Sequence, residues 1–419
     1  MNIINGDCLE ELKKLEDNSV DAVITDPPYG LSNTKPQQVA DVLKAWVTGD
    51  TVSVPAKRGG FMGKDWDSFV PPPAVWEECM RVLKPGGHMA VFAGARTQDL
   101  MGLSIRLAGF EIRDTLGWVY GSGFPKSQNI ARQLDKTLGE DVPIGKSFNT
   151  AGGGDRESEF ANNGRSEAHK QWSPMSDAAK QWDGWGTALK PAIEPIILAR
   201  KPLDGTVANN VLAHGVGGLN IDACRVGTGE TLSYSSSKVT GATSFGTGTC
   251  TQNPAGRFPA NVLLDEHAAK EMDEQSGVSV SQRSTRKKAG ETVGNGVTLN
   301  NYHMNEDNVG GYSDSGGASR FFPVFKYQAK APKKERPVIE REDGTKIQHP
   351  TVKPVALMEW LVSLIVPPGG VVLDPFAGSG TTLQAALNKG FTPIGIEQDA
   401  DYIKLIEKRL EETCKTPKS

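Results

Sequence analysis

The sequence is poor in cysteine and has no apolar run long enough to cross a membrane. Its five cysteines among 419 residues show no CxxC or Cys/His spacing, which argues against a disulfide framework and against a zinc site. The first residues, Met1-Asn2-Ile3-Ile4-Asn5, do not form a signal-peptide pattern. We therefore expect a cytoplasmic protein with reduced thiols, no structural metal and no membrane contact.

Neither sign of charge dominates, because 46 Lys and Arg residues face 50 Asp and Glu residues and the net charge is −4. A nucleic-acid partner would therefore need a local positive patch. Two basic stretches are candidates, at residues 283–288 and 326–341, although either can be an ordinary solvated surface. The 37% hydrophobic content is enough for one large core or two domains.

The N-terminal part, residues 1–120, alternates between strand and helix patterns, as in half of a doubly wound sheet. The expected strands are Ile3–Ile4, Val20–Thr25, Met89–Ala93 and Phe110–Tyr120, and the expected helices are Leu9–Leu15, Ala74–Leu83 and Gln98–Leu107. From 121 to 319 Gly, Ser, Thr and Asn predominate, which is typical of a partly disordered segment or of a recognition region that orders on a partner. Within it, 260–264 and Glu194–Arg200 have strand patterns, and the latter is a candidate antiparallel partner of 110–120. The βα pattern returns from Gln348.

One informative string is Asp26-Pro27-Pro28-Tyr29-Gly30, which follows the buried-strand pattern of Val20–Thr25. At the end of that strand, the Asp26 carboxylate and the rigid proline carbonyls would form a set of acceptors for an NH2 group. Tyr29 offers a ring that can stack on a heteroaromatic base, and Gly30 lets the chain turn away. The alternative is an ordinary turn, because Asp, Pro and Gly are common turn residues.

The second informative string is LDPFAGSGTT at residues 373–382. A strand at 371–373, a turn at Gly378-Ser379-Gly380 and a helix to about Lys389 would let the backbone approach a ligand closely. The next strand, 392–396, ends in Glu397, about twenty residues after Asp374, where an acidic residue binds a ribose hydroxyl in dinucleotide-type folds. A purely structural strand-to-helix loop is the alternative.

The two strings can share one site only if their strands, 20–26 and 371–374, are neighbours in the sheet. Ligands of open α/β sheets bind at the carboxyl ends of strands, where the strand order reverses. We therefore expect an α/β fold with a circularly permuted, Rossmann-like sheet of seven mostly parallel strands and a large central insertion.

The order of these motifs resembles that of the β-class DNA amino-methyltransferases, the DNA methylase N-4/N-6 family, in which DPPY precedes the target-recognition region and FxGxG comes last. Here Asp26–Tyr29 matches DPPY and Phe376–Gly380 matches FxGxG. Asn5-Gly6-Asp7 and His349–Pro354 are further matches. The resemblance covers residues 1–120 and 348–412 well and implies a class I methyltransferase sheet, whereas the central region matches no recognition domain with an assignable target.

The resemblance implies that the chain transfers the methyl group of S-adenosylmethionine to the N6 amine of a flipped-out adenine in DNA, with cytosine N4 as the alternative. The implied catalytic residues are Asp26, Pro27, Pro28 and Tyr29. The implied cofactor-binding residues are Asp7, Thr351, Lys353, Asp374, Phe376, Gly378, Gly380, Thr381 and Glu397. Phe376 has the alternative role of a core aromatic, and Thr351 and Lys353 that of capping a helix that begins near Pro354.

The resemblance also implies an organisation into a catalytic half (1–120), an insertion with the target-recognition region (121–347, in which 194–200 returns to the sheet), a cofactor half (348–412) and a tail (413–419). A polar loop at Leu31–Gly60 could close over DNA. A cognate restriction endonuclease is an expected partner. Two alternatives stay open: an RNA or protein-glutamine methyltransferase, which the motif order disfavours, and a non-catalytic DNA-binding relative, which the intact Asp26 and Gly378 disfavour.

Overall fold

The computed structural model describes residues 2–32, 34–55, 67–121, 123, 127–140, 172–227, 256–281, 284–285, 309–310, 314–325, 336–341 and 343–415. Most of the two basic stretches lies outside the described residues, including Arg283, Arg286, Lys287, Lys288, Lys326, Lys330, Lys333 and Lys334. The chain divides into two compact units, one formed by Met1–Gly121 with Ile193–Ser419 and the other by Ser122–Ala192.

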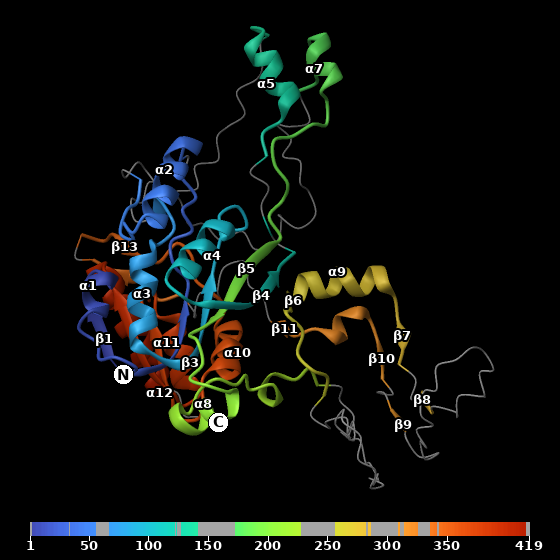
Figure 1. Ribbon diagram of the computed structural model, residues 1–419. Coiled ribbons are helices and arrows are strands. Elements are labelled where there is room, and N and C mark those ends of the chain that lie inside the picture. Colours follow the sequence, from blue (N-terminus) through green and yellow to red (C-terminus); the bar gives the residue numbers. More distant parts are fainter. Residues whose placement is uncertain are drawn as a thin grey trace, which may run out of the picture. The chain divides into compact units, whose positions relative to one another are not determined.

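The larger unit is built on a nine-stranded sheet with the order β1-β15-β14-β2-β3-β5-β4-β6-β11 (Figure 1). Its strands are β1 (Asn2–Asn5), β2 (Val20–Thr25), β3 (Leu83–Phe92), β4 (Glu111–Val119), β5 (Ile193–Arg200), β6 (Val262–Asp265), β11 (Val324–Phe325), β14 (Val371–Asp374) and β15 (Thr392–Glu397). All neighbouring pairs are parallel except those of β5, which runs antiparallel to β3 and β4. The first seven strands in this order form the expected permuted sheet, and β6 and β11 extend it by two.

The position of the two motifs in this sheet follows from the strand order. β14 pairs with β2, with Leu373 opposite Val23, although the two strands are far apart in the sequence. From this pair the chain proceeds outward on one side through β15 and on the other through β3, so the strand order reverses between β14 and β2. Such a reversal opens a crevice at the carboxyl ends of the strands, which is where both motifs begin.

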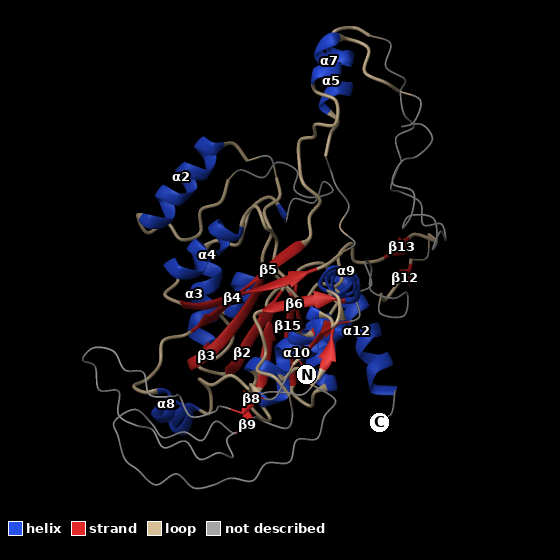
Figure 2. Cartoon of the chain, turned by 90° about the vertical axis from the view of Figure 1, so that its right-hand side faces the viewer, coloured by secondary structure: helices blue, strands red, loops and turns tan. Residues whose placement is uncertain are grey.

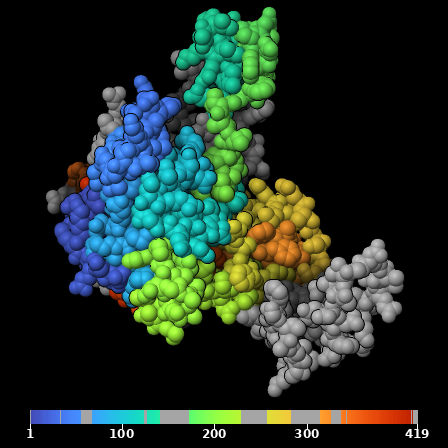
Figure 3. Space-filling model, viewed as in Figure 1, coloured from blue at the N-terminus to red at the C-terminus, as the bar shows by residue number. Residues whose placement is uncertain are grey.

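Helices cover both faces of the sheet (Figure 2). Alternate residues of β2 point to opposite sides, so that Val23 joins one buried cluster while Ala22 and Ile24 join the other. The Val23 face is covered by α1 (Cys8–Leu12), α2 (Pro36–Val47), α3 (Pro73–Val82) and α4 (Gln98–Leu107), and the outer surface of this layer is blue to cyan in Figure 3. The opposite face is covered by α10 (Val355–Ile365) and α11 (Thr381–Asn388), while α12 (Ala400–Lys415) packs on β1 and α11.

The helix α2 corrects one expectation, because Leu31–Gly60 is not a loop throughout. Val39, Val42, Leu43 and Trp46 recur at three- and four-residue spacing, and all four pack on the first core cluster. Pro36 occupies the first helical position, where its missing N–H costs nothing. The polar residues between these positions face away from the core and gave the segment its polar composition.

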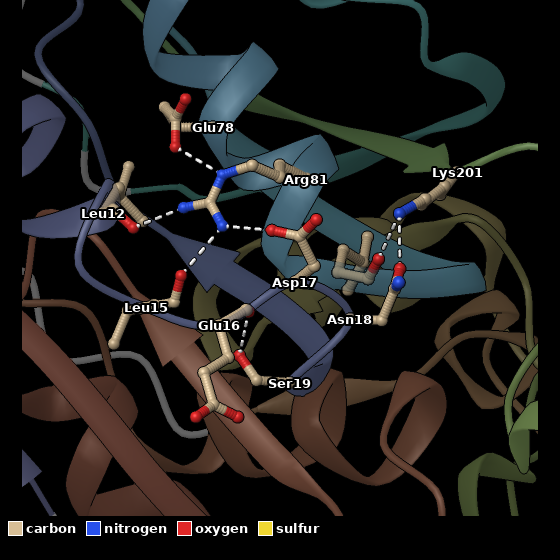
Figure 4. A network of polar contacts seen from close by, with 10 residues as sticks. Leu12, Leu15, Glu16, Asp17, Asn18, Ser19, Glu78, Arg81 and Lys201 are labelled. Carbon is tan, nitrogen blue, oxygen red and sulfur yellow. Dashed lines mark hydrogen bonds and ion pairs between the residues drawn. The ribbon is translucent and has the colours of Figure 1, made fainter.

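Arg81 of α3 anchors the segment that leads into β2 (Figure 4). Its guanidinium donates to the carbonyls of Leu12 and Leu15, each at 2.8 Å. It also pairs with Asp17 at 2.5 Å and with Glu78 at 2.8 Å. Four acceptors on one side chain fix the amino end of β2, and a strand fixed at one end presents its other end in a defined position.

The larger unit has further helices and strands. They are α8 (Val207–His214), α9 (Glu266–Ser276), the 3-10 helices η3 (Asp222–Cys224) and η4 (Ala318–Phe321), and the strands β7 (Ser279–Val280), β8 (Ser284–Thr285), β9 (Val309–Gly310), β10 (Ser315–Gly316), β12 (Ile339–Glu340) and β13 (Lys346–Ile347). In the smaller unit, α5 (Ile130–Thr137) and α7 (Asp177–Gln181) are joined by the buried Asp135, which accepts hydrogen bonds from Met175 and Ser176.

In the part of the chain that the structure describes, no helix combines the length and the apolar character that a membrane span needs. The same residues contain no group of three or more His, Cys, Asp or Glu side chains that could hold a metal ion.

Candidate active site

One buried carboxylate joins the ends of β2 and β14. Asp374 is 2% exposed, and its Oδ1 accepts a hydrogen bond from Thr25 Oγ1 at 2.7 Å and another from the Phe376 amide at 3.1 Å. Thr25 directly precedes the DPPYG string, and Phe376 lies in the glycine-rich string. The prediction that the two strands are neighbours is therefore confirmed, and the two strings meet at one edge of the sheet.

Four side chains meet at the end of β2, and we call them the Asp26 cluster: Asp26, Tyr29, Glu194 and Lys353. Lys353 Nζ lies 2.6 Å from Asp26 Oδ2, 3.1 Å from Tyr29 Oη and 3.3 Å from Glu194 Oε2. The Tyr29 hydroxyl donates to Asp26 Oδ1 at 2.8 Å and also lies 3.3 Å from Glu194 Oε2. The cluster thus contains two carboxylates, each of which contacts both the Lys353 ammonium and the Tyr29 hydroxyl.

Burial and charge set the protonation of the two donors in this cluster. Burial raises the pKa of Tyr29 well above its usual value, and the charges of Asp26 and Glu194 raise it further. Burial acts to lower the pKa of Lys353, but the charges of Asp26 and Glu194 outweigh it, so that this pKa is raised. At neutral pH Tyr29 is therefore a neutral phenol and Lys353 a full ammonium ion. The cluster contains more acidic than basic groups.

The backbone of the DPPYG string is held from outside. Asp67 Oδ1 accepts the amides of Tyr29 and Gly30, at 2.7 and 3.0 Å, and Thr97 Oγ1 donates to the Tyr29 carbonyl at 2.6 Å. Gly30 has φ +66°, and a Cβ there would come within 2.7 Å of the Val70 amide. Only glycine fits this turn, which lets the chain leave the site directly after Tyr29.

The glycine-rich turn of the second string is tied to Glu397 at the end of β15. The Gly378 amide donates to Glu397 Oε2 at 2.8 Å, and the Asp399 amide donates to Oε1 at 2.8 Å. Gly378 and Gly380 have φ of +54° and +79°, and a Cβ on Gly378 would lie 3.1 Å from His349 Nε2. The turn therefore brings bare backbone to the start of α11, beside a carboxylate.

Arg409 of α12 supports this turn from behind. Its side chain is 3% exposed, and it donates to the Ser379 carbonyl at 2.7 Å, to Ser379 Oγ at 3.3 Å and to Gln384 Oε1 at 2.8 Å. A planar guanidinium that satisfies three acceptors holds the turn more firmly than a single hydrogen bond could.

Two carboxyl groups at this edge are hard to ionise. Burial raises the pKa of Asp374 to about 6, against the hydrogen bonds from Thr382 and Thr25, which lower it. Burial also raises the pKa of Glu397 to about 7, although the Asp399 and Gly378 amides lower it. Strongly shifted carboxyl groups that converge on a crevice are typical of functional sites.

The other residues of the expected cofactor set lie at the same edge. β1 pairs with β15 so that Asn5 faces Glu397, and Asp7 follows two residues later, where its Oδ1 caps α1 through the amides of Leu9 and Glu10. Thr381 is buried as the first residue of α11. Phe376 is half-buried on the first core cluster, with its ring 6.3 Å from that of Trp76.

Thr351 and Lys353 do not cap α10, because the N-cap position is Pro354 and no side chain bonds there. Lys353 points into the Asp26 cluster instead. Thr351 is exposed, and its carbonyl is bonded to His349 Nδ1. Burial lowers the pKa of His349. Its ring packs edge-on against that of Tyr402, with 4.7 Å between the ring centres.

Three site residues were not found from the sequence: Asp67, Glu194 and Arg409. Each acts through a contact with a residue that is distant along the chain, so no local pattern marks it. Glu194 lies in an expected strand that is apolar between this residue and Arg200, and an acidic residue at the start of that strand was the available signal.

A family model described as DNA methylase, for N6 and N4 methylation, matches residues 20–408. The chain belongs to this family. It is 24% identical to the type II methyltransferase M.HindIII of Haemophilus influenzae over 97% of this chain and 94% of that protein. It is 48% identical to the DNA adenine methyltransferase YhdJ of Escherichia coli over 63 residues, which are 15% of this chain and 21% of that protein. The resemblance drawn from the two motifs is thereby confirmed.

Among solved structures, a complex of M1.HpyAVI with S-adenosylmethionine is similar over 98% of both chains, with a TM-score of 0.39 and 16% identity. The cytosine-N4-specific PvuII DNA methyltransferase is similar over 98% of this chain and 89% of that one, with a TM-score of 0.42 and 12% identity.

S-adenosylmethionine, the methyl donor of this family, fits the residues present. It has a sulfonium cation, a ribose and an α-amino acid, and acidic groups stand at the ends of three adjacent strands: Asp26 after β2, Asp374 in β14 and Glu397 in β15. The left-handed glycines Gly378 and Gly380 form a tight turn between β14 and α11, as in the glycine-rich turns that bind nucleosides in such folds.

Proposed function

We propose that this protein transfers the methyl group of S-adenosylmethionine to the exocyclic N6 amine of adenine in DNA. The observation that carries the proposal is the junction of the two motifs. Asp374 links Thr25 and Phe376, so the segments that carry the acceptor Asp26 and the glycine turn at Gly378 leave the sheet at the same edge. Membership of the DNA methylase family supports DNA as the substrate.

In this proposal, Asp26 binds the target amine. A sulfonium methyl group is already a strong electrophile, so the protein mainly has to place a nitrogen in line with it. The amine lone pair forms the new N–C bond as the S–CH3 bond breaks, which leaves S-adenosylhomocysteine, and the methylated nitrogen then releases one proton. A carboxylate that accepts hydrogen bonds from an aromatic NH2 withdraws its lone pair from the ring and stabilises the positive charge that develops on nitrogen. The carbonyl of Pro27 is the second acceptor. Because a paired base cannot reach this edge, the adenine must leave the duplex, and Tyr29 offers its ring for stacking.

The cofactor-binding roles are proposed for the residues around the glycine turn. Glu397 accepts the ribose hydroxyls, and Asp7 lies where the adenine of the cofactor would be bound, at the end of β1 next to β15. Asp374, Phe376, Gly378, Gly380, Thr381 and Thr351 line the rest of this edge. Lys353 belongs to the Asp26 cluster, so we assign it to the methyl-acceptor side of the site.

Adenine is preferred to cytosine for two reasons. The acidic residue at the first position of the DPPY motif favours adenine in the family resemblance, and one relative is named as a DNA adenine methyltransferase. Cytosine N4 is the second candidate, because the matching family model includes both N6 and N4 enzymes. A cognate restriction endonuclease and a cytoplasmic location remain predictions from the sequence.

The test is expression in a bacterial host that lacks DNA methylation, followed by sequencing that distinguishes N6-methyladenine from N4-methylcytosine. N6-methyladenine at one recurring sequence is expected with the natural protein and none with Asp26→Ala. N4-methylcytosine would favour the second candidate. Unmodified DNA, from a folded protein that binds S-adenosylmethionine in calorimetry, would refute a DNA substrate.

A further inference from the structure

The side chain of Glu194 belongs to the Asp26 cluster, although the pairing of its strand does not depend on that side chain. Glu194 lies in β5, opposite Trp118 of β4, and strand pairing there uses only backbone groups. Its side chain is 28% exposed, so water could have solvated the carboxylate. Instead its Oε2 lies 3.3 Å from both Lys353 Nζ and Tyr29 Oη. These are the same two groups that bond Asp26.

The ammonium of Lys353 weakens the stabilisation that Asp26 can give to the reacting amine. This ammonium lies 2.6 Å from Asp26 Oδ2, where it offsets the negative charge that the target amine needs as it becomes positive. Because the cluster is buried, the effect of the ammonium on Asp26 and on the developing positive charge is stronger than it would be in water. A second carboxylate beside Lys353 reduces this neutralisation of Asp26, because the ammonium then interacts with two carboxylates.

The position of the ammonium agrees with such sharing. Lys353 Nζ is 3.1 Å from the Tyr29 hydroxyl oxygen but 5.3 Å from the centre of the Tyr29 ring. It therefore lies at the hydroxyl edge of Tyr29 and not over its face. The same edge is where Glu194 Oε2 is placed. Lys353 Nζ and the Tyr29 hydroxyl are therefore both within reach of Glu194 Oε2.

We propose that Glu194 is a positioning residue for methyl transfer: it is the counterion that holds Lys353 and the Tyr29 hydroxyl, so that Asp26 keeps its charge and an acceptor oxygen for the substrate amine. This inference rests on the proposed function. It adds a residue that acts through Lys353 and does not itself touch the reacting atoms.

The test uses Glu194→Gln in the full-length protein, with tritiated S-adenosylmethionine and genomic DNA from a host without methylation. Loss of one carboxylate near the developing charge is expected to lower kcat by about 10- to 100-fold. The KM for DNA and the Kd for S-adenosylmethionine are expected to stay within about twofold, because in this proposal Glu194 acts through Lys353 and the Tyr29 hydroxyl and contacts neither substrate. Glu194→Asp, which keeps the charge at a longer distance, should give an intermediate kcat. The matched control is Asp114→Asn on the neighbouring β4, an exposed carboxylate outside the site.

A double-variant cycle separates a role through Lys353 from a merely structural one. If Glu194 acts by holding the ammonium, Glu194→Gln should cost little more once Lys353→Gln has removed that charge. Multiplying losses in the double variant would overturn the inference, and so would a Glu194→Gln protein with unchanged kcat or with a raised KM alone. Absence of methyl transfer by the natural protein would instead refute the proposed function. If Glu194→Gln fails to fold, the kcat of Glu194→Asp decides in the same way.

Discussion

The hydrogen bond between Thr25 and Asp374 joins the two motifs. Its contribution to the free energy of unfolding can be measured by removing the Thr25 hydroxyl. Thr25 is fully buried, and its hydroxyl donates to Asp374 Oδ1 at 2.7 Å. Thr25→Val removes the donor at nearly constant size. Hydrogen bonds to charged groups contribute about 1.5 to 3 kcal/mol, so we expect the free energy of unfolding to fall by about 2 kcal/mol at pH 8.

The loss of stability in Thr25→Val should depend on pH, because the hydrogen bond acts on an ionisable group. Burial raises the pKa of Asp374 to about 6, above its unfolded value, so ionising this group costs native stability as the pH rises from about 4 to about 6. The Thr25 bond offsets part of that cost, because it favours the charged form. Without this bond the pKa of Asp374 rises further, so the loss caused by Thr25→Val should be complete only above that higher pKa, near pH 8, and should disappear as the pH falls below 6.

Urea unfolding at pH 5 and pH 8, with Thr25→Ser as the control that keeps the hydroxyl, measures both effects. The serine variant should lose about 1 kcal/mol for the missing methyl group at either pH. Equal losses for the two variants at pH 8, or a valine effect that does not change between pH 5 and pH 8, would refute the reasoning.

Three further outcomes are expected. Arg81→Ala should lower the free energy of unfolding by about 2 kcal/mol without changing the Kd for S-adenosylmethionine, and a changed Kd would contradict its purely structural role. Gly378→Ala should weaken cofactor binding in calorimetry, because a Cβ would press on His349 at positive φ. Gly390→Ala, equally left-handed but in open space, should cost about 1 kcal/mol of stability and leave binding unchanged. With a Glu397 pKa of about 7, cofactor affinity should fall below pH 7 by up to about tenfold per pH unit, and Glu397→Gln, if the carboxylate is the ligand, should bind weakly without this dependence.

The sequence predicted most of the sheet because its strands carry their own signals. β2 is buried at every position, and apart from Asp21 and Thr25 its residues are apolar, as is typical of central parallel strands. The glycine turn before α11 was equally visible, since positive φ at Gly378 and Gly380 demands glycine. The polar composition of Leu31–Gly60, in contrast, hid α2, although its apolar residues recur at helical spacing.

The site itself was only half visible from the sequence. Asp26 and Tyr29 stood in a compact string, but their partners come from other strands and from a segment far along the chain. Glu194 reaches the cluster because β5 inserts between β3 and β4, and Lys353 because α10 packs below β2 and β3. Tertiary packing determines these contacts, so no residue pattern within one segment could predict them.

The strand order has a consequence for how the protein is made. β14 and β15 are translated after every other strand, yet they fill the gap between β1 and β2. A chain that ends before residue 371 therefore lacks the two strands that join β1 to β2, together with the glycine turn and Glu397. Premature stop codons before residue 371 should therefore abolish methyl transfer, because they remove strands that lie inside the sheet.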